Sequence, residues 1–476
     1  MRLCTLRPVL AFTLSRGECV AFDGLMVSVS GVRGRVGEAL TPEVVAHFAA
    51  AFGAWARSRA GGRTAVVLGR DSRVSGPMFH RAAAAALQSV GCDVIDIGLT
   101  MTPTCQLAVE YHHAAGGIML SASHNPVEWN ALKFIGPTGL FLEASEGTEM
   151  RALMDRAIPR APWDGLGALR ADDDAGRRHL DAVLALPQID VDAIRRRRIR
   201  VALDCCRGAG GAFMPELLQR LGCEVTGINL ETDGRFPRPP EPIAENLGEL
   251  ERLVRESSAD IGFAVDPDVD RLALVDERGR AIGEDYTLAL AARVVLARTP
   301  GIVVTNLSTS RVVDDVAEAA GSRVIRAPVG EVNVAVRMRN EGAVVGGEGN
   351  GGVILPDLHL GRDAPVAAAL VLQLLASDRR GLSEIVADHP RYAIVKDKMD
   401  RPNVSFAAVY DALQDAFPDA TADTQDGLRL AWPDRWVHVR PSGTEPIVRV
   451  IAEARDEEQA RELVARSRVP LEALAR

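Results

Sequence analysis

A short polar segment, residues 121–126 (Ser-Ala-Ser-His-Asn-Pro), follows the apolar run 117–120 and carries hydroxyls, an imidazole and an amide. Such exits from a strand into a loop are where α/β enzymes often keep catalytic groups. Pro126 disfavours helical geometry at Asn125, so Ser123 is expected on an exposed loop of defined shape. The segment is a candidate for a nucleophilic or phosphorylatable serine, although a plain polar turn after a strand uses the same residue types.

Three aspartates alternate in residues 266–271 directly after an apolar strand predicted at 261–265. They are Asp266, Asp268 and Asp270, and Arg271 follows them. Alternate positions place the three carboxylates on one side of an extended or tightly turned backbone, where they would repel one another without a cation. Hard oxygen ligands suit Mg²⁺, and the spacing does not fit a calcium-binding EF-hand loop. The pattern predicts a magnesium site; the alternative is an acidic turn that faces solvent.

Residues 440–446 (Arg-Pro-Ser-Gly-Thr-Glu-Pro) join two predicted strands and are followed by Arg449. Arginine side chains and the N–H groups of a glycine-containing loop can hold a phosphate group. Proline and glycine are equally consistent with an ordinary hairpin connection, but the two arginines favour phosphate.

A glycine-rich segment, residues 346–352, follows the strand-like run 343–345 and includes Glu348 and Asn350. Its glycines would let the backbone approach a ligand while these two side chains bond hydroxyl groups, as in polyol recognition; a plain turn remains the alternative. The glycine spacing differs from that of dinucleotide-binding loops. Residues 30–34 and 69–73 place further arginines, including Arg33, on glycine-flanked loops.

Strand-like and helical patterns alternate through most of the chain, which predicts parallel α/β units. The pattern of the last part of the chain, residues 391–476, predicts an α+β arrangement. We therefore expect an α/β fold of three related α/β domains with mixed sheets and a C-terminal α+β domain. The predicted boundaries are an extension at 1–26 and domains at 27–165, 166–284, 285–390 and 391–476.

Composition limits the classes of protein that fit. The 476-residue chain is 47% hydrophobic and 25% charged, which is typical of a globular protein, and its net charge of −9 disfavours nucleic acid or anionic membranes as partners. Seven cysteines without a C-x-x-C pair favour a reducing cytoplasm. No apolar run approaches the roughly 20 residues that span a bilayer. An anionic ligand would need a local basic site.

Taken in order, these loops resemble those of the α-D-phosphohexomutase family, which includes phosphoglucomutases, phosphomannomutases and phosphoglucosamine mutases. The resemblance runs from about Val27 to the C-terminus. Residues 121–126 match the family serine loop, residues 266–271 its metal loop, and residues 440–446 its phosphate loop in full.

The resemblance implies four domains around a central cleft and a mechanism in which Ser123, as phosphoserine, exchanges phosphoryl groups with a hexose 1- or 6-phosphate through a bisphosphate. It also implies Mg²⁺ bound by Ser123 and the three aspartates, and a hexose 1,6-bisphosphate as intermediate or activator. His124, Lys133 and Arg33 are the further catalytic candidates. The substrate-binding candidates are Arg271, Glu348, Asn350, Arg440, Ser442, Gly443, Thr444 and Arg449.

The sugar loop departs from the family pattern G-E-x-S-G-H, because Asn350 replaces the usual serine and Gly352 the usual histidine. His359 lies near enough in sequence to be considered as a substitute. Pro267 replaces the usual glycine of the metal loop and should stiffen it.

The serine loop and the Glu-x-Asn pattern are most similar to phosphoglucosamine mutases, so glucosamine phosphate is the expected substrate. Phosphomannomutase or phosphoglucomutase activity is the nearest alternative. A catalytically silent sugar-phosphate-binding relative and a phosphomonoesterase stay open. The expected partner is a small phosphosugar, and the expected state is a monomer or homodimer.

Overall fold

The computed structural model describes residues 11–13, 19–21, 24–28, 30–61, 64–154, 156–401, 405–441 and 447–475. The chain forms two compact units. The first comprises the described parts of Met1–Ala185 with Ala202–Leu250 and Ala264–Asp270; the second comprises Leu186–Val201, Glu251–Phe263 and the described parts of Arg271–Arg476. The extension predicted at 1–26 lies largely outside the described residues, which include the short antiparallel pair β1 (Ala11–Thr13) and β2 (Cys19–Ala21).

The first unit contains a seven-stranded mixed sheet in the order β3-β4-β8-β7-β5-β6-β9. β5 pairs in parallel with β6 and β7, β6 pairs in parallel with β9, and β3, β4 and β8 form the antiparallel side. The strands are β3 Met26–Val27, β4 Gly31–Arg35, β5 Thr64–Arg70, β6 Cys92–Leu99, β7 Gly116–Leu120, β8 Trp129–Ile135 and β9 Leu169–Ala171. The mixed sheet agrees with the predicted fold class.

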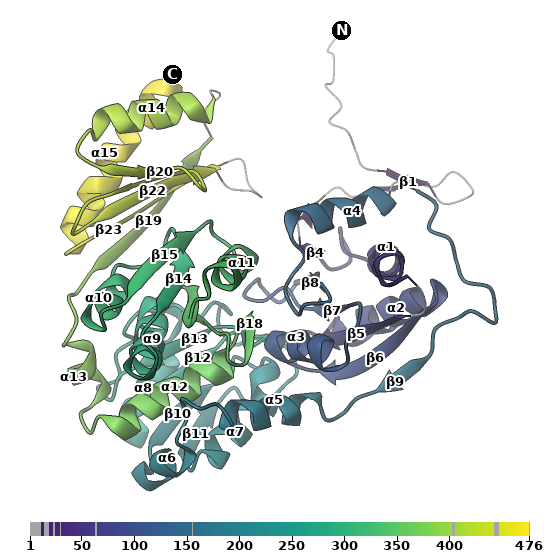
Figure 1. The fold of residues 1–476 in the computed structure, drawn as a ribbon, viewed down its shortest axis with the longest axis horizontal. Helices are drawn as coiled ribbons and strands as arrows, with labels where there is room; N and C mark the ends of the chain where they lie inside the picture. The colour runs from purple at the N-terminus through teal and green to yellow at the C-terminus, as the bar shows by residue number, and fades with distance from the viewer. Residues whose placement is uncertain are drawn as a thin grey trace. The chain divides into compact units, whose positions relative to one another are not determined.

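Two faces of this sheet carry different helices (Figure 1). One core joins α1 (Pro42–Ala60), α2 (Gly76–Ser89) and α4 (Ala144–Met154) to alternate strand residues. α3 (Thr102–Tyr111) packs on β5 and β7 from the other face, where Gly117 leaves room for Val109. The sheet is therefore covered on both sides, and its loops are the places left for polar groups.

A four-stranded sheet in the order β11-β10-β12-β13 follows, and its strands belong in part to each unit. The strands are β10 Arg200–Asp204, β11 Glu224–Ile228, β12 Ile261–Val265 and β13 Leu272–Val275. The helices of this region are α5 Ala175–Leu184, α6 Val191–Arg197, η1 Ala209–Ala212, α7 Met214–Arg220, η2 Ala244–Asn246 and α8 Gly248–Ser257.

The second unit has a mixed five-stranded sheet in the order β15-β14-β16-β17-β18. β14 is parallel to both of its neighbours, β15 and β16. β17 is antiparallel to both of its neighbours, β16 and β18. The strands are β14 Ile302–Asn306, β15 Arg323–Ala327, β16 Val345–Glu348, β17 Gly352–Leu355 and β18 His359–Arg362. The helices are α9 Asp285–Arg298, α10 Val312–Ala319, α11 Glu331–Glu341, α12 Ala364–Ser377 and α13 Leu382–Val386.

The C-terminal part of the second unit is an antiparallel sheet in the order β19-β23-β22-β21-β20. α14 and α15 pack together against it and share one apolar core with its strands (Figure 1). The strands are β19 Ala393–Asp400, β20 Thr421–Asp423, β21 Leu428–Ala431, β22 Trp436–Pro441 and β23 Ile447–Ala454, and the helices are α14 Phe406–Ala416 and α15 Glu457–Ala475. This part is α+β, as predicted. Within the described part of the chain, no helix has the length and apolar character needed to cross a membrane.

Candidate active site

Ser123 lies on the loop after β7, and its hydroxyl donates a hydrogen bond of 2.8 Å to Asp266 Oδ2. The backbone of Ser123 has a φ of 47°, which non-glycine residues seldom adopt. Ser121 Oγ accepts a 2.9 Å bond from Ser123 N and donates a 2.7 Å bond to Asp71 Oδ2. Strained backbone that its surroundings hold in place is typical of functional loops. The serine is thus held against the predicted aspartate loop, and the expectation that it is exposed is wrong: Ser123 is buried.

Arg73 binds the backbone of the serine loop, and the sequence did not predict this role. Its side chain has no exposed surface, and its guanidinium pairs with Asp71 at 3.1 Å. Burial raises the pKa of Asp71, while the charge of Arg73 opposes that effect. The guanidinium also donates 2.6–2.8 Å bonds to four carbonyls, those of Ser123, Asn125 and Pro126 on the loop and of Trp129 at the start of β8.

Replacing Arg73 by methionine should lower the free energy of unfolding by about 3–5 kcal/mol, because Asp71 would remain as a buried charge without its cation. Urea unfolding followed by circular dichroism measures the change. Arg70→Met is the control: the neighbouring Arg70 makes a backbone bond to Asp71 O, so we expect a loss of about 1 kcal/mol or less. A loss that small for Arg73→Met would contradict this role.

The three aspartates converge, and of the two predicted backbone forms, extended or tightly turned, the structure has the tight turn. One carboxylate oxygen from each of Asp266, Asp268 and Asp270 lies within 4.8 Å of the others, and all three residues are buried. Val269 at the turn has a φ of 63°, an outlier for a β-branched residue. Asp268 Oδ1 is buried and accepts no hydrogen bond from the described residues. This donor set fits a small, hard divalent cation.

Lys133 on β8 and Thr102 at the start of α3 both contact the aspartate loop. Lys133 Nζ donates a 2.6 Å bond to Asp268 Oδ2 and lies 3.8 Å from Asp270 Oδ2, and Thr102 Oγ1 donates to Asp268 Oδ2. Burial opposes ionisation, but the charge of Lys133 and these hydrogen bonds hold the pKa of Asp268 well below its usual value. Asp268 is therefore ionised at neutral pH, as a metal ligand must be.

The other catalytic candidates of the first unit lie near the serine. His124 Nδ1 is 3.5 Å from Ser123 Oγ, and Arg33 on β4 donates a 3.0 Å bond to Asn125 Oδ1. The structure thus brings together every predicted catalytic and metal residue, with His124 placed where an imidazole can exchange a proton with an oxygen on Ser123.

In the second unit, the glycine-rich segment is a hairpin between β16 and β17, in which Glu348 pairs with Gly352. Asn350 Oδ1 accepts a 3.3 Å bond from Gly352 N, so this predicted binding residue also closes the turn. Asn306 Nδ2 and Gly330 N donate to Glu348 Oε1 at 2.8 and 2.9 Å.

Arg362, which the sequence did not single out, occupies the space beside Gly352. A Cβ atom at Gly352 would lie 2.2 Å from Arg362 Cδ. Arg362 is buried and joins Glu348 Oε2, at 2.7 Å, to Glu331 Oε2, at 3.0 Å. Burial, the largest single effect, would raise the pKa of Glu348, but the charge of Arg362, the hydrogen bonds from Asn306 and Gly330 and the charge of Arg271 together outweigh it, so the pKa is lowered. Glu348 is ionised and can accept a bond from a sugar hydroxyl.

His359 does not replace the missing histidine of the sugar loop. It is buried, its Nε2 lies 2.9 Å from Asp363 Oδ2, and its Nδ1 accepts a 3.2 Å bond from Gly361 N. Both ring nitrogens are engaged within its own strand and the following helix start. The group next to Gly352 is Arg362, which cannot act as a base.

The phosphate candidates lie on the C-terminal sheet. Arg440 and Arg449 stand opposite each other on β22 and β23, and Arg440 Nη1 donates a 2.7 Å bond to Asp426 Oδ2. Arginines directly opposite each other repel, which favours an anion between them. The predicted residues Ser442, Gly443 and Thr444 lie outside the described residues.

His438 on β22 should make stability pH-dependent. Its Nε2–H donates to the carbonyl of Asp426, and its Nδ1 accepts from the Ser308 hydroxyl at 2.8 Å. Burial lowers its pKa to about 4 from 6.5. The unfolded chain therefore binds a proton at higher pH than the folded chain, so this stability is present above pH 6.5 and is lost as pH falls towards 4.

Between pH 7 and pH 4.5, wild type should lose about 2–3 kcal/mol more unfolding free energy than His438→Gln. Urea titrations at both pH values measure it. His113→Gln, at an exposed histidine, should retain the wild-type slope; equal slopes for wild type and His438→Gln would contradict the prediction.

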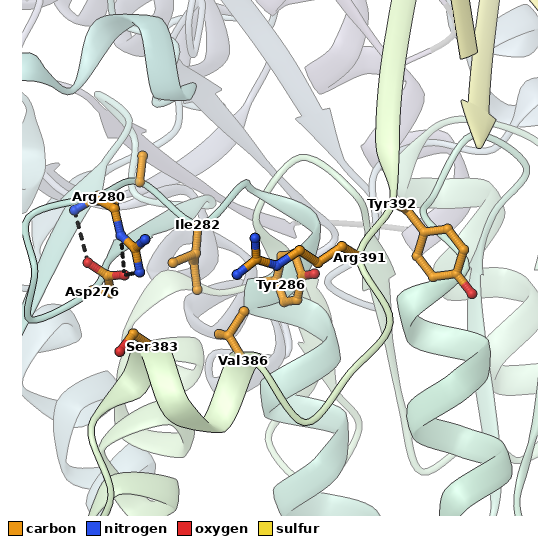
Figure 2. Close-up of a pocket in the computed structure, with 9 residues that line it drawn as sticks. Asp276, Arg280, Ile282, Tyr286, Ser383, Val386, Arg391 and Tyr392 are labelled. Atoms are coloured by element: carbon orange, nitrogen blue, oxygen red, sulfur yellow. Dashed lines mark hydrogen bonds and ion pairs between the residues drawn. The ribbon is translucent and has the colours of Figure 1, made fainter. Parts of the chain in front are cut away.

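A separate pocket of about 260 Å³ in the second unit contains none of the predicted site residues. Figure 2 shows that Tyr286, Arg391 and Tyr392 line it, while Arg280 pairs with Asp276 at 2.8 Å. The candidate chemistry therefore does not extend to this pocket.

Mixed α/β sheets with an aspartate triad facing a loop serine define a phosphohexomutase-type enzyme, and comparison with known proteins agrees. Residues 25–160, 177–279 and 283–392 match α/β/α domains I, II and III of the phosphoglucomutase/phosphomannomutase family, and residues 393–468 match its C-terminal domain. The chain belongs to the phosphoglucomutase/phosphomannomutase family.

Relatives within this family carry two kinds of name. A "probable phosphoglucosamine mutase" of Methanopyrus kandleri is 40% identical, over 92% of this chain and 96% of that protein. A "phosphoglucomutase/phosphomannomutase" of Thermococcus kodakarensis is 39% identical, over 92% and 96%. A crystal structure of a phosphoglucomutase/phosphomannomutase family protein from Burkholderia thailandensis has a TM-score of 0.82 at 26% identity and covers 94% of this chain and 98% of that one.

Proposed function

We propose that this enzyme interconverts a hexose 6-phosphate and the hexose 1-phosphate through phosphoserine at Ser123, with glucosamine 6-phosphate as the preferred substrate. The observation that carries the proposal is the 2.8 Å contact between Ser123 Oγ and Asp266 inside a triad of buried carboxylates. A serine hydroxyl that contacts a cluster of buried carboxylates able to bind a divalent cation supports a role in phosphoryl transfer rather than in a structural turn.

In the first half-reaction, the sugar O1 hydroxyl would attack the phosphorus on Ser123. The P–Oγ bond breaks, a P–O1 bond forms, and the hydroxyl proton passes to a nearby base, for which His124 is placed 3.5 Å from Oγ. In the second half-reaction, Ser123 Oγ would attack the phosphorus on O6 of the hexose 1,6-bisphosphate. The P–O6 bond breaks, a P–Oγ bond forms, and the proton lost by the serine hydroxyl is returned to O6, which leaves hexose 1-phosphate and restores the phosphoserine. The bisphosphate is therefore an intermediate and could also prime the unmodified enzyme.

Asp266, Asp268 and Asp270 would hold Mg²⁺ together with an oxygen on Ser123. When bound, Mg²⁺ neutralises negative charge on the transferred phosphoryl group. Lys133 keeps Asp268 ionised and adds a positive charge near the same oxygens. Arg33, through Asn125, helps to set the shape of the serine loop.

The second unit would supply sugar and phosphate recognition. Glu348, ionised by its contact with Arg362, can accept a bond from a hydroxyl or from the ammonium group of an amino sugar. Asn350 and Arg271 are the further sugar candidates, and Arg440 and Arg449 would bind the phosphate that does not react. Relatives named "probable phosphoglucosamine mutase", which are 35–40% identical, support glucosamine phosphate as the substrate. The relative named "phosphoglucomutase/phosphomannomutase", which is 39% identical, supports glucose or mannose phosphate.

Comparing kcat/KM for glucosamine, glucose and mannose 6-phosphates, with Mg²⁺ and hexose 1,6-bisphosphate present, tests the proposal. The highest value for glucosamine 6-phosphate would support it. A clear preference for glucose or mannose 6-phosphate would transfer the assignment to the phosphoglucomutase/phosphomannomutase activity. Release of inorganic phosphate in proportion to substrate would indicate a phosphomonoesterase, and no turnover of any sugar would contradict the mutase assignment.

A further inference from the structure

Lysine is rare in this chain. Of its 55 lysine and arginine residues, only Lys133, Lys396 and Lys398 are lysines. For a general surface charge the two residue types are interchangeable, whereas a compact ammonium with three rotatable donors and a planar guanidinium make different contacts. Lys133 already contacts the aspartate loop. The other two lysines, Lys396 and Lys398, both lie on β19.

Lys398 stands at one end of a row of basic residues that crosses three strands. In the antiparallel register, Lys398 on β19 is opposite Arg449 on β23, and Arg449 is opposite Arg440 on β22. Residues directly opposite in neighbouring strands point to the same face of a sheet. The three cationic side chains therefore share one face.

That face is the one away from α14 and α15. The neighbours of Arg449 along β23, Val448 and Val450, belong to the apolar core that these helices cover, while Arg449 itself is exposed. Lys398 is exposed as well. No described residue accepts a hydrogen bond or ion pair from Lys398 Nζ. Lys398 and Arg449 are therefore accessible to a ligand from solvent, and Arg440, the third member of the row, is half-buried.

Like charges on directly opposed residues destabilise a sheet unless an anion lies among them. Two acidic groups are close: Asp426 accepts from Arg440, and Asp400 lies two residues along β19 from Lys398 on the same face. The register of Lys398, Arg449 and Arg440 gathers three cationic side chains on one face of the sheet. A phosphate monoester, which carries nearly two negative charges at neutral pH and several acceptor oxygens, is a suitable ligand for such a group of cations.

We propose that Lys398, Arg449 and Arg440 together bind the phosphate group of the phosphosugar, with Lys398 as a third cation that phosphate affinity requires. The identity of the ligand as a phosphosugar rests on the proposed function. The two guanidiniums can each offer paired N–H donors, and the ammonium of Lys398 supplies a mobile charge from the edge strand.

Lys398→Met in the full-length protein tests this inference. Isothermal titration with glucose 6-phosphate in chelator should give a Kd about tenfold higher than wild type, since a charge-assisted hydrogen bond to the phosphate is lost. Lys398→Arg should recover the affinity to within about threefold. Lys396→Met is the matched control, because Lys396 lies on the same strand and face but is opposite Ile451 and pairs with Glu284 at 3.3 Å.

Wild-type affinity in Lys398→Met, or an equal loss in Lys396→Met, would overturn the inference. In turnover assays, Lys398→Met should raise KM about tenfold with little change in kcat, a split that a general folding defect would not produce. If no hexose phosphate is turned over but Lys398→Met still weakens glucose 6-phosphate binding relative to Lys396→Met, the proposed function is wrong. The inference that the row of basic residues binds phosphate is then still supported.

Discussion

Replacing Ser123 by alanine should lower kcat by at least about 10³-fold while phosphosugar affinity stays within about threefold of wild type. The alanine variant lacks the oxygen that would carry the phosphoryl group, so no residual route through a covalent intermediate remains. The fold should tolerate the change, because Arg73 binds the loop through the carbonyl of Ser123 and not through its hydroxyl.

Two measurements distinguish a lost phosphoryl carrier from a distorted loop. Intact-mass spectrometry after incubation with hexose 1,6-bisphosphate should show one added phosphoryl group in wild type and none in Ser123→Ala. Ser121→Ala is the matched control: it loses the bond that Ser121 accepts from Ser123 N, so we expect lower stability and about tenfold lower kcat, with phosphorylation retained. A Ser123→Ala enzyme with wild-type turnover would exclude the phosphoserine mechanism.

Replacing Asp270 by asparagine should remove the Mg²⁺ response and lower kcat by about 10²–10³-fold, the range expected when a preorganised electrostatic group is lost. In wild type, Mg²⁺ at 100 times its Kd should stabilise the folded chain by about 2.7 kcal/mol, seen as a higher Tm. The variant should show no such shift. In chelator it should be at least as stable as wild type, because one of three neighbouring buried carboxylates has lost its charge.

Asp276→Asn is the control for that experiment. Asp276 is also a buried aspartate, but it pairs with Arg280 away from the triad. Its variant should have a lower Tm than wild type and yet keep the full Mg²⁺-induced increase. If Asp270→Asn keeps the Mg²⁺ shift, the triad is not the metal site.

The alternation of apolar runs and polar loops was sufficient to predict the α/β units, since burial of a strand or helix face leaves a local record in the sequence. β12 (Ile261–Val265) matches its predicted residues. The alanine-rich segment predicts a helix at 77–90, and the observed α2 (Gly76–Ser89) begins and ends one residue earlier. β8 (Trp129–Ile135), which carries Lys133, was not predicted because its residues lack a clear two-residue alternation.

The candidate reactive groups could also be identified from the sequence, because Ser123 and the three aspartates each lie in a short segment whose residue types and spacing are unusual. Their partners were not. Ser123 and Asp266 are 143 residues apart, and Arg73 lies 50 residues before the carbonyl of Ser123 that it binds. Nothing local to Arg73 distinguishes a buried guanidinium from an exposed one.

By itself, then, the sequence determined which chemical groups this protein has and on which loops they lie. Only the tertiary structure decided how they are held: that Arg362 fills the space beside Gly352 and keeps Glu348 ionised, and that Lys398 is in register with Arg449 and Arg440. The physical reason is that motif chemistry depends on neighbours in the chain, whereas burial, charge pairing and strand register depend on residues that only folding brings together.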